Sequence, residues 1–126
     1  MAFFVFHVFR AAKTGRFLEH VSEADIVKSI MRYLKTVPGC FFWKEHGGMY
    51  GTAGIPDIIA CIGGHFFGFE VKTEKGRPTK LQEAVIRKII AAGGTALVVR
   101  SVEEVRAAVE SVRREQSGGE AEGRNT

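Results

Sequence analysis

The sequence predicts a single α/β domain with a mixed central β-sheet, built from an antiparallel hairpin plus a crossover strand and flanked by helices. Three observations favour this class. The chain has 126 residues, a length that suits one compact domain. Gly63-Gly64 separates two β-prone runs, which is typical of a tight hairpin. A helical segment then joins the hairpin to a further β-branched run, as in a crossover connection.

The first clear element is a helix that begins at Ser22. This residue offers a capping hydroxyl, and apolar residues recur at helical spacing from Ile26 to Val37 before Pro38-Gly39 ends the pattern. Three β-prone runs follow, and we expect strands at 40–43, 57–62 and 65–72.

The second half of the chain again alternates predicted helices and strands. Thr79 is predicted to cap a helix with Gln82 at its third position, and Gly93-Gly94 ends that helix. A strand is expected over 95–99, and Ser101 precedes a short helix. We therefore divide the chain into an N-terminal Phe-rich segment, a folded domain and a disordered tail, at residues 1–20, 21–114 and 115–126. The first segment is compatible with a strand, a docking segment or a short helix.

Charge is concentrated in one part of the chain. Lysine and arginine number 18 against 14 acids, a net charge of +4, and the stretch from Lys72 to Lys88 alone carries this excess. A basic block in an otherwise neutral protein indicates a polyanionic partner, although a solvated basic helix end is the simpler alternative. No apolar run reaches membrane-spanning length. With Cys40 and Cys61 in apolar runs, we expect a soluble cytoplasmic protein of bacterial or phage type, with reduced core cysteines and no membrane partner.

The hairpin places two carboxylates together. If Gly63 and Gly64 form its loop, the numbers of paired residues sum to 127, so Asp57 faces Glu70, with Lys72 on the same face. Opposed carboxylates about 5 Å apart repel unless a cation neutralises them, and hard oxygen ligands suit Mg²⁺ or Mn²⁺. Taken separately, each part has a structural alternative. Asp57 is compatible with a turn residue, and Glu70 and Lys72 are compatible with an exposed pair on an edge strand.

These residues resemble a known family. Gly54-Ile55-Pro56-Asp57, Glu70-Val71-Lys72 and Gln82 occur in the order found in the PD-(D/E)xK nuclease superfamily, and more narrowly in the small standalone VRR-NUC domains. The resemblance covers roughly residues 22–112. It implies a restriction-endonuclease-like fold and a metal site that contains Asp57, Glu70 and the Val71 carbonyl.

The resemblance also implies roles for other residues. Lys72 would assist the attacking water, and Gln82 would steady Lys72 or the scissile phosphate. Glu23 is the candidate for a further metal ligand, with a helix-dipole role as its alternative. The residues expected to contact DNA are Lys75, Arg77, Lys80 and Arg100, although the final Val99-Arg100-Ser101 lacks the second arginine of the family pattern.

The sequence therefore predicts a Mg²⁺- or Mn²⁺-dependent endodeoxyribonuclease, with catalytic residues Asp57, Glu70, Lys72 and Gln82. The family suggests branched DNA as substrate, of Holliday-junction or flap type, and a homodimer that aligns two sites. The Phe-rich N-terminus adds apolar surface for a partner subunit. Two alternatives stay open: a non-cleaving DNA-binding module of the same fold, and a nuclease directed at RNA.

Overall fold

The structure is a computed structural model that describes residues 21–46 and 51–123. The Phe-rich segment at residues 1–20, residues 47–50, and residues 124–126 at the end of the tail lie outside the described residues. No helix within the described ranges is both long and apolar enough to cross a membrane.

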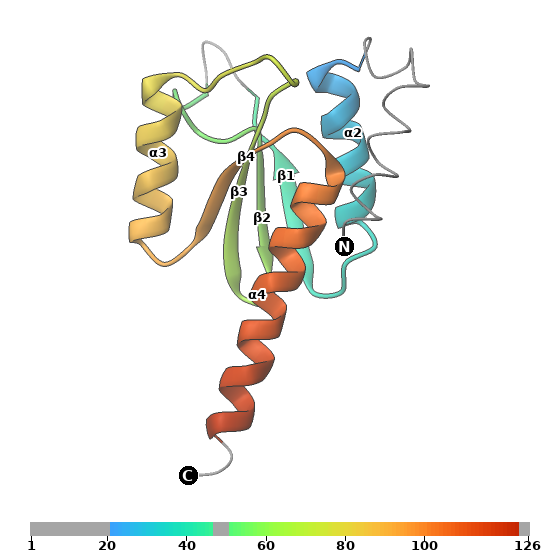
Figure 1. The fold of residues 1–126 in the computed structure, drawn as a ribbon, viewed down its shortest axis with the longest axis vertical. Coiled ribbons are helices and arrows are strands. Elements are labelled where there is room, and N and C mark those ends of the chain that lie inside the picture. The colour runs from blue at the N-terminus through green and yellow to red at the C-terminus, as the bar shows by residue number, and fades with distance from the viewer. Residues whose placement is uncertain (1–20, 47–50, 124–126) are drawn as a thin grey trace, which may run out of the picture.

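A four-stranded sheet forms the centre of the fold, in the order β1-β2-β3-β4 (Figure 1). The strands are Cys40–Lys44, Ile58–Ile62, His65–Val71 and Thr95–Val99. Neighbours β1–β2 and β2–β3 are antiparallel, whereas β3–β4 is parallel, so the predicted mixed sheet is confirmed. The predicted hairpin register is also confirmed, because Ile58 pairs with Phe69 and Ile62 with His65.

Two helices cover one face of the sheet. Helix α2 (Glu23–Leu34) and helix α4 (Val102–Gly123) lie side by side in front of the strands in Figure 1. Ser22 caps α2 as predicted, since its Oγ accepts a hydrogen bond from the Asp25 amide at 3.1 Å. The main core lies between these helices and the sheet, where the largest fully buried side chains include Phe67, Phe69 and Ile30.

Helix α3 (Lys80–Ala91) packs on the opposite face. Gly68 lies between Phe67 and Phe69 in β3, so the side-chain position on its Cα faces away from the main core. A Cβ added there would lie 2.9 Å from Pro56 Cγ and 3.2 Å from Ile89 Cδ1 of α3. Glycine at this position therefore lets α3 and the loop before β2 approach the sheet closely.

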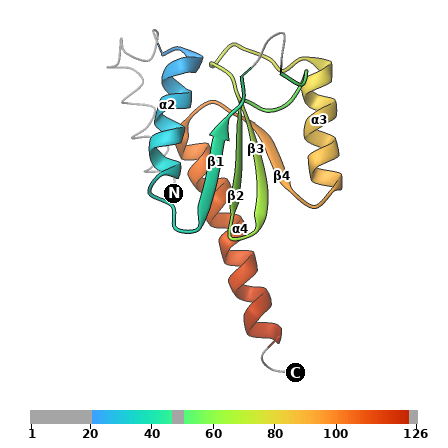
Figure 2. The ribbon, with the colours of Figure 1, turned by 180° about the vertical axis from the view of Figure 1, so that it is seen from behind.

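Helix α3 leaves much of its face of the sheet open. None of its own residues is fully buried, and β1 and β2 lie uncovered by any described helix in Figure 2. Cys61, expected in the core, is exposed on this face. It points away from the main core because it alternates with the buried residues Ala60 and Ile62.

Helix α4 continues to Gly123, beyond residue 114, where the sequence predicts a disordered tail. That expectation rested on the Gly, Glu and Ser content of the tail, and the helix shows it to be wrong up to Gly123. The continuation has a tertiary contact that composition does not reveal, because Gln116 Nε2 donates to Gly63 O of the β2–β3 turn at 3.4 Å. Beyond that contact the helix projects past the sheet (Figure 1).

Candidate active site

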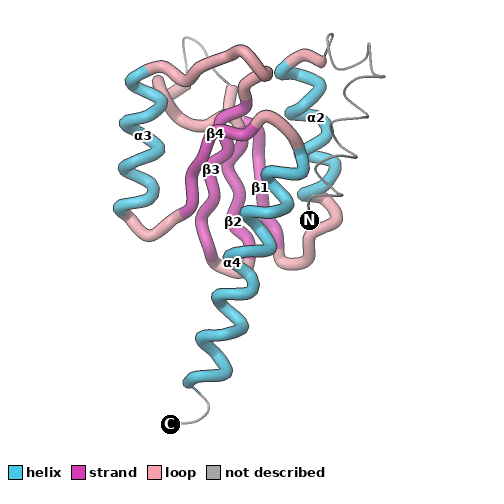
Figure 3. Tube along the Cα trace, in the orientation of Figure 1, coloured by secondary structure: helices cyan, strands magenta, loops and turns pink. Residues whose placement is uncertain are grey.

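The predicted site residues gather at one end of the sheet. Because β2 runs antiparallel to β3 and β4 runs parallel to it, the start of β2 lies beside the ends of β3 and β4. Figure 3 shows the loops that lead into β2, out of β3 and out of β4 meeting at this end. Asp57, Glu70, Lys72 and Gln82 are all brought here, on the side of the sheet that carries α3.

Asp57 is held at the entrance to β2 by its neighbours. Gly54, with a φ of +83°, packs so tightly on α3 that a Cβ would lie 2.8 Å from Leu81 Cγ. Pro56 then packs against Gly68 and fixes the direction of the chain. The Asp57 carboxylate accepts a hydrogen bond from the Val71 amide, with a distance of 2.7 Å from N to Oδ2. Asp57 thus bridges β2 and β3 at the point where their backbone ladder ends.

Glu70 is the one charged residue in the buried class among the described residues, with 2 % of its surface exposed. Its Oε1 accepts from Gln82, whereas its buried Oε2 has no hydrogen-bond partner in the described part of the chain. Burial raises the pKa of Glu70, the negative charge of Asp57 raises it further, and Lys72 only partly opposes them, so the pKa reaches about 7.

Gln82 connects the first turn of α3 to the site. Its Nε2 donates to Glu70 Oε1 at 2.9 Å, and its Oε1 accepts from the Thr79 amide at 2.9 Å. The Thr79 hydroxyl accepts in turn from the Gln82 amide, which completes the predicted capping box. The expectation for Gln82 named Lys72 or a phosphate as its partner, and the structure places it on Glu70.

Lys72 follows β3 and faces the same acid. Its Nζ lies 3.6 Å from Glu70 Oε1, and its amide donates to Val99 O of β4 at 3.0 Å. Because neighbouring residues of a strand direct their backbone groups to opposite sides, Val71 directs its amide and carbonyl toward β2. The Val71 carbonyl therefore lies on the Asp57 side of β3, where the resemblance expects a ligand.

The chemistry of this cluster fits a divalent cation. Two carboxylates and a carbonyl are hard oxygen donors, and the unpartnered Oε2 of Glu70 is a buried acceptor next to a second negative charge. A bound Mg²⁺ or Mn²⁺ would satisfy that oxygen and offset the repulsion. Within the described residues no third acid, histidine or cysteine joins the pair, so Glu23, in the first turn of α2, is not brought to it.

The predicted DNA-contacting lysines and arginine are exposed near the site. Lys75 and Arg77 lie on the loop between β3 and α3, and Lys80 is the first residue of α3. The same loop contains a tight turn, in which the Gly76 amide donates to Thr73 O at 3.1 Å. Their positions beside Lys72 are compatible with contacts to a nucleic-acid backbone.

Arg100 differs from these three residues because its side chain is already used by the protein. Its Nη1 donates to Thr73 O and, at 2.8 Å, to Gly76 O. Sequence reasoning missed this contact, since the two acceptors are backbone carbonyls 27 and 24 residues before Arg100 and carry no side-chain signal.

Comparison with known proteins agrees with this arrangement. The family model described as archaeal Holliday junction resolvase (Hjc) matches residues 46–119, more than half of the chain, including every residue of the cluster. The chain belongs to the Hjc family. This membership identifies it as a nuclease-family protein, and the match ends before the last turn of α4.

Solved structures show the same fold. A protein titled "VRR_NUC domain" superposes with a TM-score of 0.58 at 23 % identity, covering 70 % of this chain and 94 % of its own. A second, titled "VRR_NUC domain protein", gives 0.59 at 19 % identity, covering 71 % and 86 %. The expected VRR-NUC-type, restriction-endonuclease-like fold is thereby confirmed for this Hjc-family chain. No curated protein is significantly similar in sequence.

Proposed function

We propose that this Hjc-family protein is a divalent-metal-dependent endonuclease of the PD-(D/E)xK type that hydrolyses phosphodiester bonds in branched DNA. One observation carries the proposal. Glu70 is buried with an unpartnered oxygen beside Asp57, and Lys72 and Gln82 contact its other oxygen. A fold gains no stability from a buried carboxylate next to a like charge, so a ligand that needs both acids supplies the reason for it.

The residues divide the chemistry between them. Asp57 and Glu70, with the Val71 carbonyl, would hold Mg²⁺ or Mn²⁺, which supplies Lewis acidity to the phosphate and to water. Gln82 fixes the Glu70 carboxylate so that Oε2 stays directed at the site. The Lys72 ammonium would orient the water that attacks phosphorus and would stabilise negative charge that develops on the phosphate oxygens.

The substrate class rests on the family name and on the basic loop. Holliday junctions appear in the description of the matching family, which favours four-way or flapped DNA for this chain. Lys75, Arg77 and Lys80 would contact the phosphate backbone beside the metal, and such contacts are independent of base sequence. Recognition would then depend on the shape of the branch.

The open face of the sheet supports the proposal of a homodimer. Phe41, Cys61 and Phe66 form one row across β1, β2 and β3, and the exposed fractions of Phe41 and Phe66 are 69 % and 42 %. Trp43 lies two residues further along β1 and is 42 % exposed. Contiguous exposed apolar side chains of this kind are typical of protein–protein contact surfaces.

The neighbouring helix supplies the other half of such an interface. Leu81 and Ile90 of α3 are 51 % and 53 % exposed, so one face carries both a bare aromatic row and a half-exposed apolar helix. In a twofold arrangement the helix of each copy can cover the row of the other, and the two active sites lie on the same face as the contact. Residues 1–20 are the alternative cover for this surface.

Cleavage assays test the proposal directly. The protein is incubated with a four-way junction, a flap, a nicked duplex, a linear duplex and a matched RNA junction, with Mg²⁺, Mn²⁺ or EDTA. We expect metal-dependent cuts in branched DNA, and their loss in Asp57→Asn, which keeps the hydrogen-bond acceptor for the Val71 amide. Glu83→Gln on the exposed side of α3 is the matched control and should cut normally.

Two results would replace the proposal by one of its alternatives. Tight junction binding without cleavage under any metal condition would indicate a non-cleaving DNA-binding module. Preferential cleavage of the RNA junction would indicate a nuclease directed at RNA. Cleavage by Asp57→Asn at the wild-type rate would remove the metal site itself from the mechanism.

A further inference from the structure

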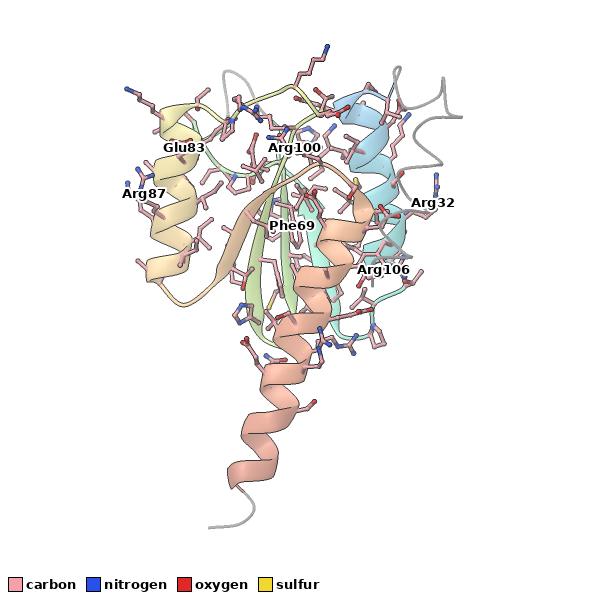
Figure 4. The ribbon with its side chains drawn as sticks, in the orientation of Figure 1. Arg32, Phe69, Glu83, Arg87, Arg100 and Arg106 are labelled. Atoms are coloured by element: carbon pink, nitrogen blue, oxygen red, sulfur yellow. The ribbon has the colours of Figure 1, made fainter. Side chains whose placement is uncertain are left out.

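Arg100 joins the end of β4 to the loop that follows β3. Its Nη1 donates to the carbonyl oxygens of Thr73 and Gly76, the first and last residues of a turn that contains Lys75 and is followed by Arg77. The Arg100 amide donates to Glu104 Oε2 at 2.9 Å, which fixes the backbone from which the guanidinium extends. Figure 4 shows Arg100 at the loop end of the sheet, above the core residue Phe69.

The turn that Arg100 closes lies against Lys72. A Cβ added to Gly76 would lie 3.4 Å from both Cβ and Cδ of Lys72, so the turn packs along the aliphatic stem of that lysine. The Lys72 amide is fixed separately by Val99 O, at 3.0 Å. Val99 therefore holds the backbone of Lys72, and Arg100 holds the turn that packs on its aliphatic stem. Only the ammonium remains free to move toward Glu70.

We propose that Arg100 is a positioning residue for the Lys72 ammonium, acting through the Thr73–Gly76 turn, and that direct contact with DNA is not its main role. This inference rests on the proposed nuclease function. Both carbonyls accept from Nη1, whose two N–H bonds are held at a fixed angle in the guanidinium plane, whereas a lysine ammonium is a point charge on a flexible stem. The fixed geometry at the two backbone acceptors therefore favours arginine over lysine at this position.

The two roles predict different effects of Arg100→Lys. A phosphate contact depends mainly on charge, which lysine preserves, so DNA affinity and its salt dependence would be retained along with cleavage. A clamp depends on the fixed position of Nη1 between the two carbonyls, so in Arg100→Lys the turn would loosen while Lys75 and Arg77 stay charged and exposed. We expect DNA affinity to change by less than about threefold and single-turnover cleavage to fall by about 10- to 100-fold, the scale for misplacing a catalytic group.

The experiment compares Arg100→Lys and Arg100→Gln with a matched pair at Arg106. Arg106 lies on α4, on the face of the sheet opposite α3, and its Cζ is 4.8 Å from the centre of the Tyr33 ring (Figure 4). Arg106→Lys and Arg106→Gln therefore make the same charge changes away from the turn. Three quantities are measured for each protein: junction affinity across a salt series, single-turnover cleavage, and amide hydrogen exchange of Gly76 with Lys72 as internal reference.

The expected pattern is specific to a clamp. Gly76, whose amide donates to the same Thr73 oxygen as Arg100, should exchange faster in both Arg100 variants, and Lys72 should not. Normal cleavage by Arg100→Lys, or unchanged Gly76 exchange in Arg100→Gln, would overturn the proposal. If the wild type cuts no substrate, the nuclease function fails, and Gly76 exchange still decides whether Arg100 holds the turn.

Discussion

Gln82 donates from its side-chain Nε2 to Oε1 of Glu70 at 2.9 Å, and the same side chain closes the capping box of α3. One residue thereby fixes both the start of a helix and the orientation of a buried carboxylate. The two roles are separable by experiment, because α2 has a capping box of the same design that touches no site residue.

We predict that Gln82→Ala lowers the free energy of unfolding by more than the loss of a helix cap does. The substitution removes the acceptor for the Thr79 amide and leaves Glu70 Oε1 without its amide donor. Asp25→Ala in α2 removes the corresponding acceptor, which takes hydrogen bonds from the Ser22 amide and hydroxyl, and leaves Glu70 untouched. Urea unfolding should show Gln82→Ala to be less stable than Asp25→Ala by about 1 kcal/mol, the net value of one hydrogen bond, and only Gln82→Ala should slow cleavage. Equal losses of stability and activity in the two variants would contradict this.

We also predict that Glu70 destabilises the folded protein as the pH rises. Its pKa is about 7 in the fold against a usual value of 4.5, so between these values the folded state binds more protons than the unfolded state. The free energy of unfolding therefore falls across this window, and the penalty is complete above it. Glu70→Gln removes the ionisable group and can still accept from Gln82, so its stability advantage should grow by roughly 2–3 kcal/mol from acid to alkaline pH.

Chemical denaturation in EDTA at about pH 4.5 and pH 8.5 measures this difference. Glu83→Gln, an exposed change of the same kind on α3, serves as the control and should parallel the wild type. A Glu70→Gln curve that also parallels the wild type would show that the buried carboxylate carries no such penalty.

Lys72→Ala should separate metal binding from the chemical step. Both carboxylates remain, so Mn²⁺ titration by calorimetry at about pH 8.5, above the pKa of Glu70, should still show Mn²⁺ binding. Single-turnover cleavage should fall by about 10²- to 10³-fold, as for the loss of one preorganised charge. Asp57→Asn should lose Mn²⁺ binding as well as cleavage. Retained cleavage in Lys72→Ala would exclude the lysine from the reaction.

The basic loop should account for the salt dependence of binding. If each subunit neutralises roughly 4–6 phosphates, the logarithm of the affinity falls with log salt at a slope of about −4 to −5. Lys75→Ala with Arg77→Ala should flatten this slope by about 1–2 on every DNA sequence. Lys28→Ala with Arg32→Ala removes the same charge from exposed positions of α2 and should leave the slope unchanged (Figure 4). The reverse result would place DNA on the α2 face.

Phe41→Asp should separate the two copies of the proposed dimer. Phe41 is 69 % exposed, so the substitution removes little of the subunit's own core. We expect sedimentation to show a dimer for the wild type and a monomer for Phe41→Asp, whereas Arg106→Asp, a charge change on α4, stays dimeric. A wild type that is monomeric at tens of micromolar would contradict the dimer. A dimer that survives in Phe41→Asp would place the contact elsewhere.

Most of the fold follows from local sequence signals. The Ser22 and Thr79 caps and the Gly63-Gly64 turn fix three elements, and the hairpin turn also sets the register from Ile58 to Phe69 that brings Asp57 close to Glu70. Side-chain alternation then places the acids opposite the main core. The cluster was predictable for the same reason, since its acids and lysine lie within one hairpin and its glutamine within one capping box.

The remaining features depend on contacts distant in sequence. The clamp of Arg100 on two carbonyls, the continuation of α4 to Gly123 beside the Gly63 turn and the exposure of Cys61 each follow from how the elements pack. Composition near residue 116 favours disorder, and no local pattern reveals that Gln116 reaches Gly63. The partner of Gln82 was likewise undetermined, because spacing alone does not distinguish Glu70 from Lys72.

The burial of Glu70 has an evolutionary consequence. If the protein is the nuclease proposed above, this acid is retained by selection for its role in cleavage although its ionised form is unfavourable in the fold. Once that selection is relaxed, a neutral residue at this position removes the activity and stabilises the protein in a single step. Lineages that keep this architecture for binding alone should therefore lose the acid of β3 early, and reversion to a nuclease would require them to give up stability again.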